Sequence, residues 1–175
     1  DLPAKDVDAM FRALHTVYRT NSEFLRALQE IGPNPSSPKG LGNLLMHWID
    51  TLQPSYSHYI DVYTPHLDTR PDIAHHVRLP SVLQNVNRQI PRNDYPTGWT
   101  LDRFFELPIL RLVFYKKLYG RLLRNAQPGR SDHTLLLTAN EKLDALNQRA
   151  QRQKSSLGSI PANQKGLVST SSPLP

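Results

Sequence analysis

The sequence feature that most constrains the fold is the stretch from Thr100 to Arg124, TLDRFFELPILRLVFYKKLYGRLLR. It is mostly apolar and basic, and one proline, Pro108, interrupts it. Thr100 is a good N-cap, and Asp102 in the first turn favours the positive end of a helix dipole. We therefore predict a long helix that is kinked at Pro108, ends near Asn125 and forms the centre of the domain.

Helical spacing recurs on both sides of this stretch. Apolar residues at steps of three, four or seven predict a first helix over 5–31, with one apolar face made of Val7, Phe11, Leu14, Tyr18, Leu25 and Leu28. The next stripe predicts a helix over 41–63, kinked or broken at Pro54, with a core face made of Leu41, Leu45, Trp48, Leu52, Tyr56, Tyr59 and Tyr63.

Three further helices are expected. Residues 65–78 carry weak signals and predict a short helix with irregular flanks, and Leu79-Pro80 is typical of the first turn of a helix. The last helix should reach about Gln153, with a seam made of Leu135 or Leu136, Ala139, Leu143, Leu146 and Ala150. We find no strand-like alternation with hairpin signals, so the predicted fold class is all-α, an elongated multi-helix bundle with a kinked central helix.

The length predicts a single domain, because 175 residues with 38% hydrophobic content can form one core. We assign residues 1–153 to that domain. Residues 154–175 are rich in Ser, Pro and Gly, and we interpret them as a disordered tail or linker. The chain begins at Asp1 rather than methionine, which suggests a piece of a longer protein.

The charge of the chain indicates an acidic or phosphate-bearing partner. Lys and Arg number 21 against 15 Asp and Glu, a net charge of +6. Most of the excess lies between residues 101 and 130, where the bases are Arg103, Arg111, Lys116, Lys117, Arg121, Arg124 and Arg130 and the acids are Asp102 and Glu106. Four of these bases, Lys116, Lys117, Arg121 and Arg124, could follow a phosphate backbone, although runs of charge are usually the solvated face of a helix.

Active-site chemistry is not expected. The chain has no cysteine, its seven histidines show no metal-ligand spacing, and no nucleophile-elbow, phosphate-loop or dinucleotide-binding motif occurs. We therefore predict no catalytic residue, no metal and no cofactor. No apolar run is long enough to span a membrane and no signal peptide opens the chain, which predicts a soluble domain.

Arg111 is the one base that the helical wheel places on the apolar side of the central helix. It falls among Leu107, Phe114 and Leu118, where an unpaired guanidinium would cost several kcal/mol. We predict a buried structural role for Arg111, with a carboxylate or backbone carbonyl of a neighbouring helix as its partner.

The stretch LDRFFELPILRLVFYKKLYGRLLRNAQP resembles the third conserved region of Dbl-homology domains, the Rho-family guanine-nucleotide exchange modules. The positions in register are Phe104, Pro108, Arg111, Leu112, Tyr115, Leu118, Leu122 and Leu123. Three other segments resemble family motifs in the right order: FRALHTVYRTNSEFLRAL at 11–28, LQPSYSHYIDVYTPHLD at 52–68 and LTANEKLDALNQRA at 137–150.

The resemblance implies a module that binds the switch regions of a Rho/Cdc42-type small GTPase. Such a domain stabilises the nucleotide-free form and disturbs the magnesium site, so that GDP leaves and GTP enters. It is a regulator rather than an enzyme with its own active site. The residues that the resemblance and the basic edge assign to GTPase binding are Lys117, Gly120, Arg121, Arg124 and Asn147. The resemblance also implies a cytoplasmic protein at the cell cortex or another membrane-associated location.

Two departures from the family pattern bear on activity. The first conserved region, which supplies a glutamate to the first switch, would lie before Asp1. The lysine of the family pattern L-L-L-K-E-L is Gly120 here. Arg121 lies about 100° further round a helix and does not replace that lysine.

These departures leave three hypotheses open. The first is a guanine-nucleotide exchange factor domain. The second is an exchange-inactive scaffold of the same fold that serves protein–protein interaction. The third is a basic helical bundle that binds an anionic membrane surface or nucleic acid, with nucleic acid the less favoured partner.

Overall fold

The computed structural model describes residues 5–31, 38–90 and 98–158, which form six α-helices and one 3₁₀ turn without a β-strand among them. The helices are α1 (Lys5–Ile31), α2 (Pro38–Val62), α3 (Pro71–Ala74), α4 (Leu79–Gln89), α5 (Leu101–Asn125) and α6 (Ser131–Gly158), and the turn is η1 (Leu67–Thr69). The all-α prediction is confirmed.

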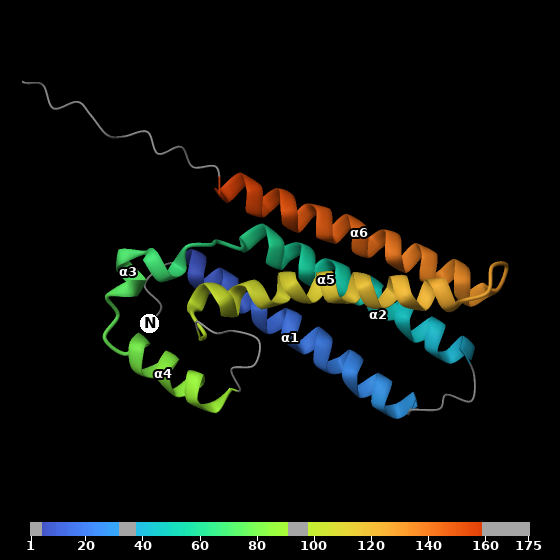
Figure 1. The fold of residues 1–175 in the computed structure, drawn as a ribbon, viewed down its shortest axis with the longest axis horizontal. Helices are drawn as coiled ribbons and strands as arrows, with labels where there is room; N and C mark the ends of the chain where they lie inside the picture. The colour runs from blue at the N-terminus through green and yellow to red at the C-terminus, as the bar shows by residue number, and fades with distance from the viewer. Residues whose placement is uncertain (1–4, 32–37, 91–97, 159–175) are drawn as a thin grey trace, which may run out of the picture.

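Four long helices lie along the length of an elongated bundle, and α3 and α4 lie at one end of it (Figure 1). Helix α2 packs against α1 on one side and α6 on the other, and α5 packs against α6. By contrast, α1 and α5 approach each other much less closely. Helices α1 and α5 therefore share little direct packing in the described part of the chain.

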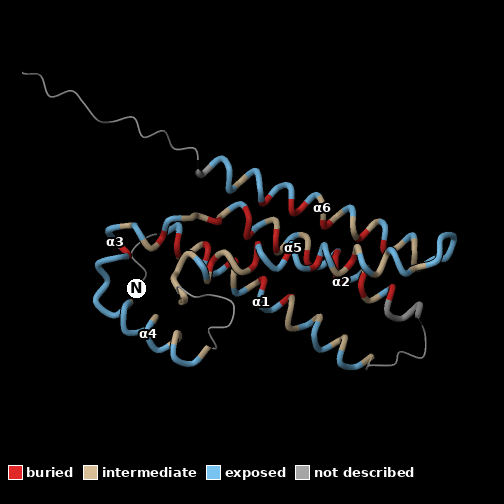
Figure 2. The backbone as a smooth tube through the Cα atoms, in the orientation of Figure 1, coloured by how far each residue is buried: buried red, intermediate tan, exposed pale blue. Residues whose placement is uncertain are grey.

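The core follows the inner faces of the long helices (Figure 2). The predicted stripe of α2 is confirmed for its described side chains, with Leu45, Trp48, Leu52, Tyr56, Tyr59 and Tyr63 all buried. The predicted seam of α6 is confirmed as well, and it consists of Leu136, Ala139, Leu143, Leu146 and Ala150. Pro54 was expected to kink or break the second helix, and α2 continues through it as one element.

The predicted apolar face of α1 is largely wrong. The helix has the expected bounds, but the residues it buries are Val7, Met10, Ala13, Val17 and Thr20. Phe11, Tyr18 and Leu25 are 53%, 68% and 56% exposed. The smaller side chains of Ala13, Val17 and Thr20 on the buried face allow α1 to lie close to α2, where the hydroxyls of Thr20 and Ser55 are 3.0 Å apart.

The central helix begins as predicted. The Thr100 hydroxyl accepts a hydrogen bond from the backbone N–H of Arg103 at 3.3 Å, which caps the start of α5. Pro108 lies inside the helix and is buried. Two buried tyrosines link α5 to α2. Tyr119 of α5 donates to the Leu45 carbonyl at 2.9 Å, and Tyr59 of α2 donates to the Phe105 carbonyl.

A reciprocal pair of aspartates fixes the start of α5 against η1. The Asp102 carboxylate accepts from the backbone N–H of Leu67 and Asp68, at 2.9 and 3.3 Å. The Asp68 carboxylate accepts from the backbone N–H of Leu101 and Asp102, at 3.0 and 3.1 Å. Asp102 lies in the first turn of α5, as predicted, and its side chain also accepts hydrogen bonds from the backbone of η1.

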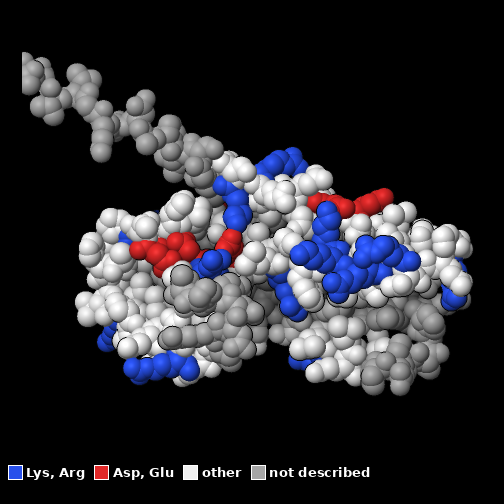
Figure 3. Space-filling view, viewed as in Figure 1, with Lys and Arg blue, Asp and Glu red and all other residues white. Residues whose placement is uncertain are grey.

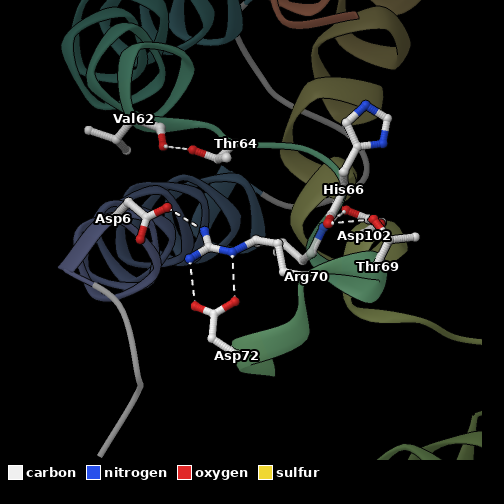
Figure 4. A network of polar contacts seen from close by, with 9 residues as sticks. Asp6, Val62, Thr64, His66, Thr69, Arg70, Asp72 and Asp102 are labelled. Atoms are coloured by element: carbon white, nitrogen blue, oxygen red, sulfur yellow. Dashed lines mark hydrogen bonds and ion pairs between the residues drawn. The ribbon is translucent and has the colours of Figure 1, made fainter. Parts of the chain in front are cut away.

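Arg70 connects this junction to α1 (Figure 4). Its guanidinium donates twice to the Asp72 carboxylate, at 2.8 and 3.2 Å, and also to the Asp6 carboxylate. The hydrogen bond from Arg70 lowers the pKa of Asp6 below its ordinary value. The end of the bundle that carries α3 is therefore tied to both α1 and α5.

The last helix is longer than predicted. Helix α6 reaches Gly158, about one turn past Gln153, so residues 154–158 are helical rather than part of a tail. The remainder of the predicted tail, 159–175, lies outside the described residues.

Candidate functional site

The outer side of α5 carries a row of exposed residues at helical spacing, which we call the α5 stripe: Leu110, Phe114, Lys117, Arg121 and Arg124. The row turns away from the buried positions of the same helix, which are Phe105, Pro108, Ile109, Leu112, Tyr115 and Tyr119. Its first half is apolar and its second half is basic.

The basic half contains three of the predicted site residues. Lys117, Arg121 and Arg124 are all exposed, and within the described part of the chain none of them forms an ion pair. Figure 3 shows Lys and Arg gathered over the C-terminal half of α5, with acidic atoms beside them on α6. Lys116 lies to the side and pairs with Asp144 of α6.

Gly120 lies between these cations and is half-buried. A Cβ at this position would meet Arg124 Nη1 at 3.8 Å, which is ordinary van der Waals contact. The structure therefore brings Gly120 together with the three cations, and a Cβ fits there in ordinary van der Waals contact.

The structure buries the side chain of Asn147, and its predicted binding role stays a prediction. Asn147 is 6% exposed, and its amide donates to the Leu112 carbonyl at 3.3 Å and the Leu143 carbonyl at 2.9 Å. The amide links α6 to α5. Burial of a polar group requires such partners, which explains why an asparagine suits this position.

The predicted burial of Arg111 is wrong. Arg111 is exposed, and its guanidinium lies over two rings, with Cζ 4.6 Å from the centroid of Phe114 and 5.0 Å from that of Tyr115. Within the described residues it forms no ion pair with a carboxylate. Cation–π contact, rather than a buried salt bridge, satisfies this cation.

A polar chain beneath Arg111 connects three helices. The Tyr115 hydroxyl donates to Asn21 Oδ1 at 2.6 Å, and Asn21 Nδ2 donates to the Tyr56 hydroxyl at 3.3 Å. Burial raises the pKa of Tyr56 well above its ordinary value, so this hydroxyl stays neutral at any physiological pH. The aromatic support of Arg111 is therefore fixed to α1 and α2.

Sequence reasoning missed the apolar half of the stripe. Leu110 is 37% exposed and Phe114 is 50% exposed, and Val113, beside the stripe, is 37% exposed. The run Leu112 to Tyr115 is apolar at every position, so spacing alone does not say which side is buried. The signal that could have helped is Arg111 itself, since a charged residue usually marks the solvent side.

Two classes of site are not found. No group of three or more metal-ligating side chains comes together among the residues that the structure describes. Nor does any helix in those ranges have the length and apolarity needed to cross a bilayer.

Comparison with known proteins identifies the family. The model of the RhoGEF domain matches residues 1–151. Rho guanine nucleotide exchange factor 37 of Rattus norvegicus is 25% identical over 154 residues, which cover 87% of this chain and 22% of that protein. The Homo sapiens protein of the same name is 25% identical over 160 residues, with the same coverage.

These relatives are much longer than the present sequence, which spans about a fifth of their length. No solved structure matches the chain. The match to the family model covers most of the sequence, and the helical bundle agrees with the fold that the motifs predict. The chain therefore belongs to the RhoGEF, or Dbl-homology, domain family.

Proposed function

We propose that this chain is a guanine-nucleotide exchange domain that binds a Rho/Cdc42-type small GTPase through the basic half of the α5 stripe. The observation that carries the proposal is the exposure of Lys117, Arg121 and Arg124 on one side of α5, without ion pairs in the described part of the chain. Family membership supports the class of partner, and both relatives are named as guanine nucleotide exchange factors.

Exchange of this kind is differential binding rather than bond chemistry. A protein that binds the nucleotide-free GTPase more tightly than the GDP-bound form favours GDP release by that difference in free energy. The cations of the stripe would supply attraction and orientation toward an acidic surface of the GTPase. No catalytic side chain is needed, so we propose a regulator of a GTPase rather than an enzyme with its own active site.

Gly120 is the observation that favours a second candidate function, an exchange-inactive scaffold. The family pattern has a lysine here, and glycine offers a partner no side chain. A bundle that keeps the fold and lacks this contact would be an exchange-inactive scaffold.

Nucleotide exchange on purified components tests both functions. The chain is mixed with Rho- and Cdc42-type GTPases loaded with fluorescent GDP, and release is followed after excess unlabelled nucleotide is added. Faster release than from the GTPase alone is expected. The absence of both acceleration and binding to the nucleotide-free forms would contradict the proposal, whereas binding without acceleration would favour the scaffold.

Two variants sharpen this experiment. Gly120→Lys should increase acceleration, because it supplies the lysine of the family pattern at a position where a Cβ fits. Acceleration by Gly120→Lys alone would identify the natural chain as the scaffold. Lys117→Glu should reduce acceleration, while Arg88→Glu on α4 makes the same change of charge on an exposed residue outside the stripe and should leave it unchanged.

A further inference from the structure

The end of α6 after Ala150 buries none of its described side chains. Residues 151–156 are exposed, apart from Gln153, which is half-buried. An ion pair between Lys154 and Glu106 of α5 joins this segment to the bundle. A helix end with few buried contacts opens locally at low cost in free energy. This segment can therefore adopt the extended backbone in which a modifying enzyme binds its substrate.

The same segment carries a recognition pattern for a serine kinase. Its residues 152–155 read Arg-Gln-Lys-Ser, so Arg152 precedes Ser155 by three residues. A carboxylate pocket of a kinase can bind a guanidinium at this spacing and so place the serine hydroxyl beside the γ-phosphate of ATP. The Arg152 guanidinium is exposed, donates to the Gln148 carbonyl at 3.4 Å and forms no ion pair within the described residues.

Ser22 follows Arg19 at the same spacing, but it lies inside α1. Its side chain is half-buried, and its hydroxyl donates to the Tyr18 carbonyl at 2.9 Å. Helix α1 also buries Thr20, two residues earlier. Presenting Ser22 to a kinase would therefore require α1 to open around a residue of its buried face, at a higher cost than opening a helix end.

Ser81 follows Arg78 at the same spacing, in the first turn of α4. The Arg78 carbonyl accepts from the Ser81 hydroxyl at 2.9 Å and from the Val82 N–H at 3.1 Å, so the pattern is closed into one turn. Pro80 within it restricts the backbone further. We therefore expect Ser81 to be a poorer substrate than Ser155.

We infer that Ser155 is a phosphorylation site for a serine kinase that selects arginine three residues before the serine. In the reaction Ser155 Oγ attacks the γ-phosphorus of MgATP, the bond from that phosphorus to the β–γ bridging oxygen breaks, and ADP leaves. The hydroxyl proton passes to the catalytic aspartate of the kinase. This inference goes beyond the proposed exchange function, and its test requires no GTPase.

A phosphate on Ser155 would act on the end of α6. It adds a charge of about −1.5 to −2 at the negative end of the helix dipole. The last turn of α6 contains no basic residue that could offset this charge. The phosphate also attracts Lys154 and so competes with Glu106 for it. We expect the end of α6 to open and to separate from α5.

Mass spectrometry of the full 175-residue chain tests the site after incubation with MgATP and the catalytic domain of calmodulin-dependent protein kinase II. Phosphate is expected on Ser155 and should be absent there in Ser155→Ala. Ser156→Ala, at the next exposed serine, should keep full incorporation. Arg152→Ala should lower kcat/KM by at least about tenfold, whereas Arg26→Ala, at an exposed arginine of α1, should change it less than about twofold.

Hydrogen exchange measures the effect on the helix. After phosphorylation, amides of residues 154–158 should exchange about two- to fivefold faster, and those of residues 136–150 should not change. Ser155→Ala treated with the same kinase is the control.

The site is overturned by a lack of phosphate on Ser155, by faster phosphorylation of Ser22 or Ser81, or by equal effects of Arg152→Ala and Arg26→Ala. Phosphorylation of Ser155 with unchanged exchange at residues 154–158 would overturn the expected opening of the helix end.

Discussion

The residues of helix α5 belong to two sides, an inner one and an outer one, which differ in burial and in hydrogen bonding. The inner side buries Leu112, Tyr115 and Tyr119 against neighbouring helices, and its polar atoms have hydrogen-bond partners inside the bundle. The outer side exposes Phe114 and Arg121. Residues of the inner side should therefore determine stability, and those of the outer side should determine binding.

Leu112→Ala should give the largest effect of any change in α5. Leu112 is fully buried, and large-to-small changes at such positions cost about 2–5 kcal/mol because a cavity remains. Leu110→Ala, two residues away on the outer side, should change the free energy of unfolding by less than about 1 kcal/mol. Urea unfolding followed by circular dichroism measures both free energies of unfolding. Similar losses in the two variants would contradict the proposed difference between the two sides.

Asn147→Ala should cause the next largest loss of stability. The amide donates to carbonyls of both α5 and α6, and its loss removes two buried hydrogen bonds, at a cost of about 1–3 kcal/mol in total. Asn125→Ala, at an exposed amide with a local hydrogen bond, is the control and should stay within about 0.5 kcal/mol. If Asn147→Ala kept full stability and lost GTPase binding, the residue would belong to the interface after all.

Arg111→Leu should cost little stability. The guanidinium is exposed, and its contact with two rings contributes about 0.5–1 kcal/mol. The measurement is the same urea midpoint, with Arg88→Leu on α4 as the control for loss of a surface charge. A loss of several kcal/mol would restore the buried role that the sequence suggested.

Low pH should weaken the junction between η1 and the start of α5, which Asp68 and Asp102 form. Burial works to raise the pKa of Asp68, but the hydrogen bonds it accepts from the Thr100 hydroxyl and the backbone N–H groups of Asp102 and Leu101 outweigh burial and hold the pKa below its ordinary value. The contribution of this carboxylate is full above the ordinary aspartate pKa, about 4, and is lost as the pH falls below it.

Unfolding midpoints between about pH 6 and pH 2 measure this effect. Asp68→Asn should flatten the decline, because an amide does not titrate. Asp50→Asn, at an exposed aspartate of α2 that pairs with Lys142, is the comparison. A decline as steep in Asp68→Asn as in the natural chain would show that the junction does not contribute to acid sensitivity.

The parts of the fold that follow from sequence are those with a single apolar face. On α6 one seam contains every buried aliphatic position, and on α2 the aromatic stripe has no rival face, so periodicity identifies both. The Thr100 cap could be predicted for a similar reason, since a hydroxyl before an apolar run has a specific use at a helix start.

The parts that do not follow are those where two faces compete. Helix α1 carries aromatic and leucine side chains on one face and mostly smaller ones on another, and the sequence favours the larger, whereas close packing on α2 selects Ala13 and Val17. Helix α5 is apolar on several sides, so the orientation of Arg111 depends on neighbours far away in sequence. Asn147 illustrates the same limit, because an amide suits a buried carbonyl as well as a partner surface.

The separation of the two sides of α5 is tested most directly by one variant in which Lys117, Arg121 and Arg124 are all replaced by Glu. Its urea midpoint and its affinity for a nucleotide-free Rho- or Cdc42-type GTPase are measured together. We predict an unchanged midpoint and an affinity lower by at least about tenfold, since three attractive contacts become repulsive. An unchanged affinity with an unchanged midpoint would contradict the assignment of binding to the outer side of α5.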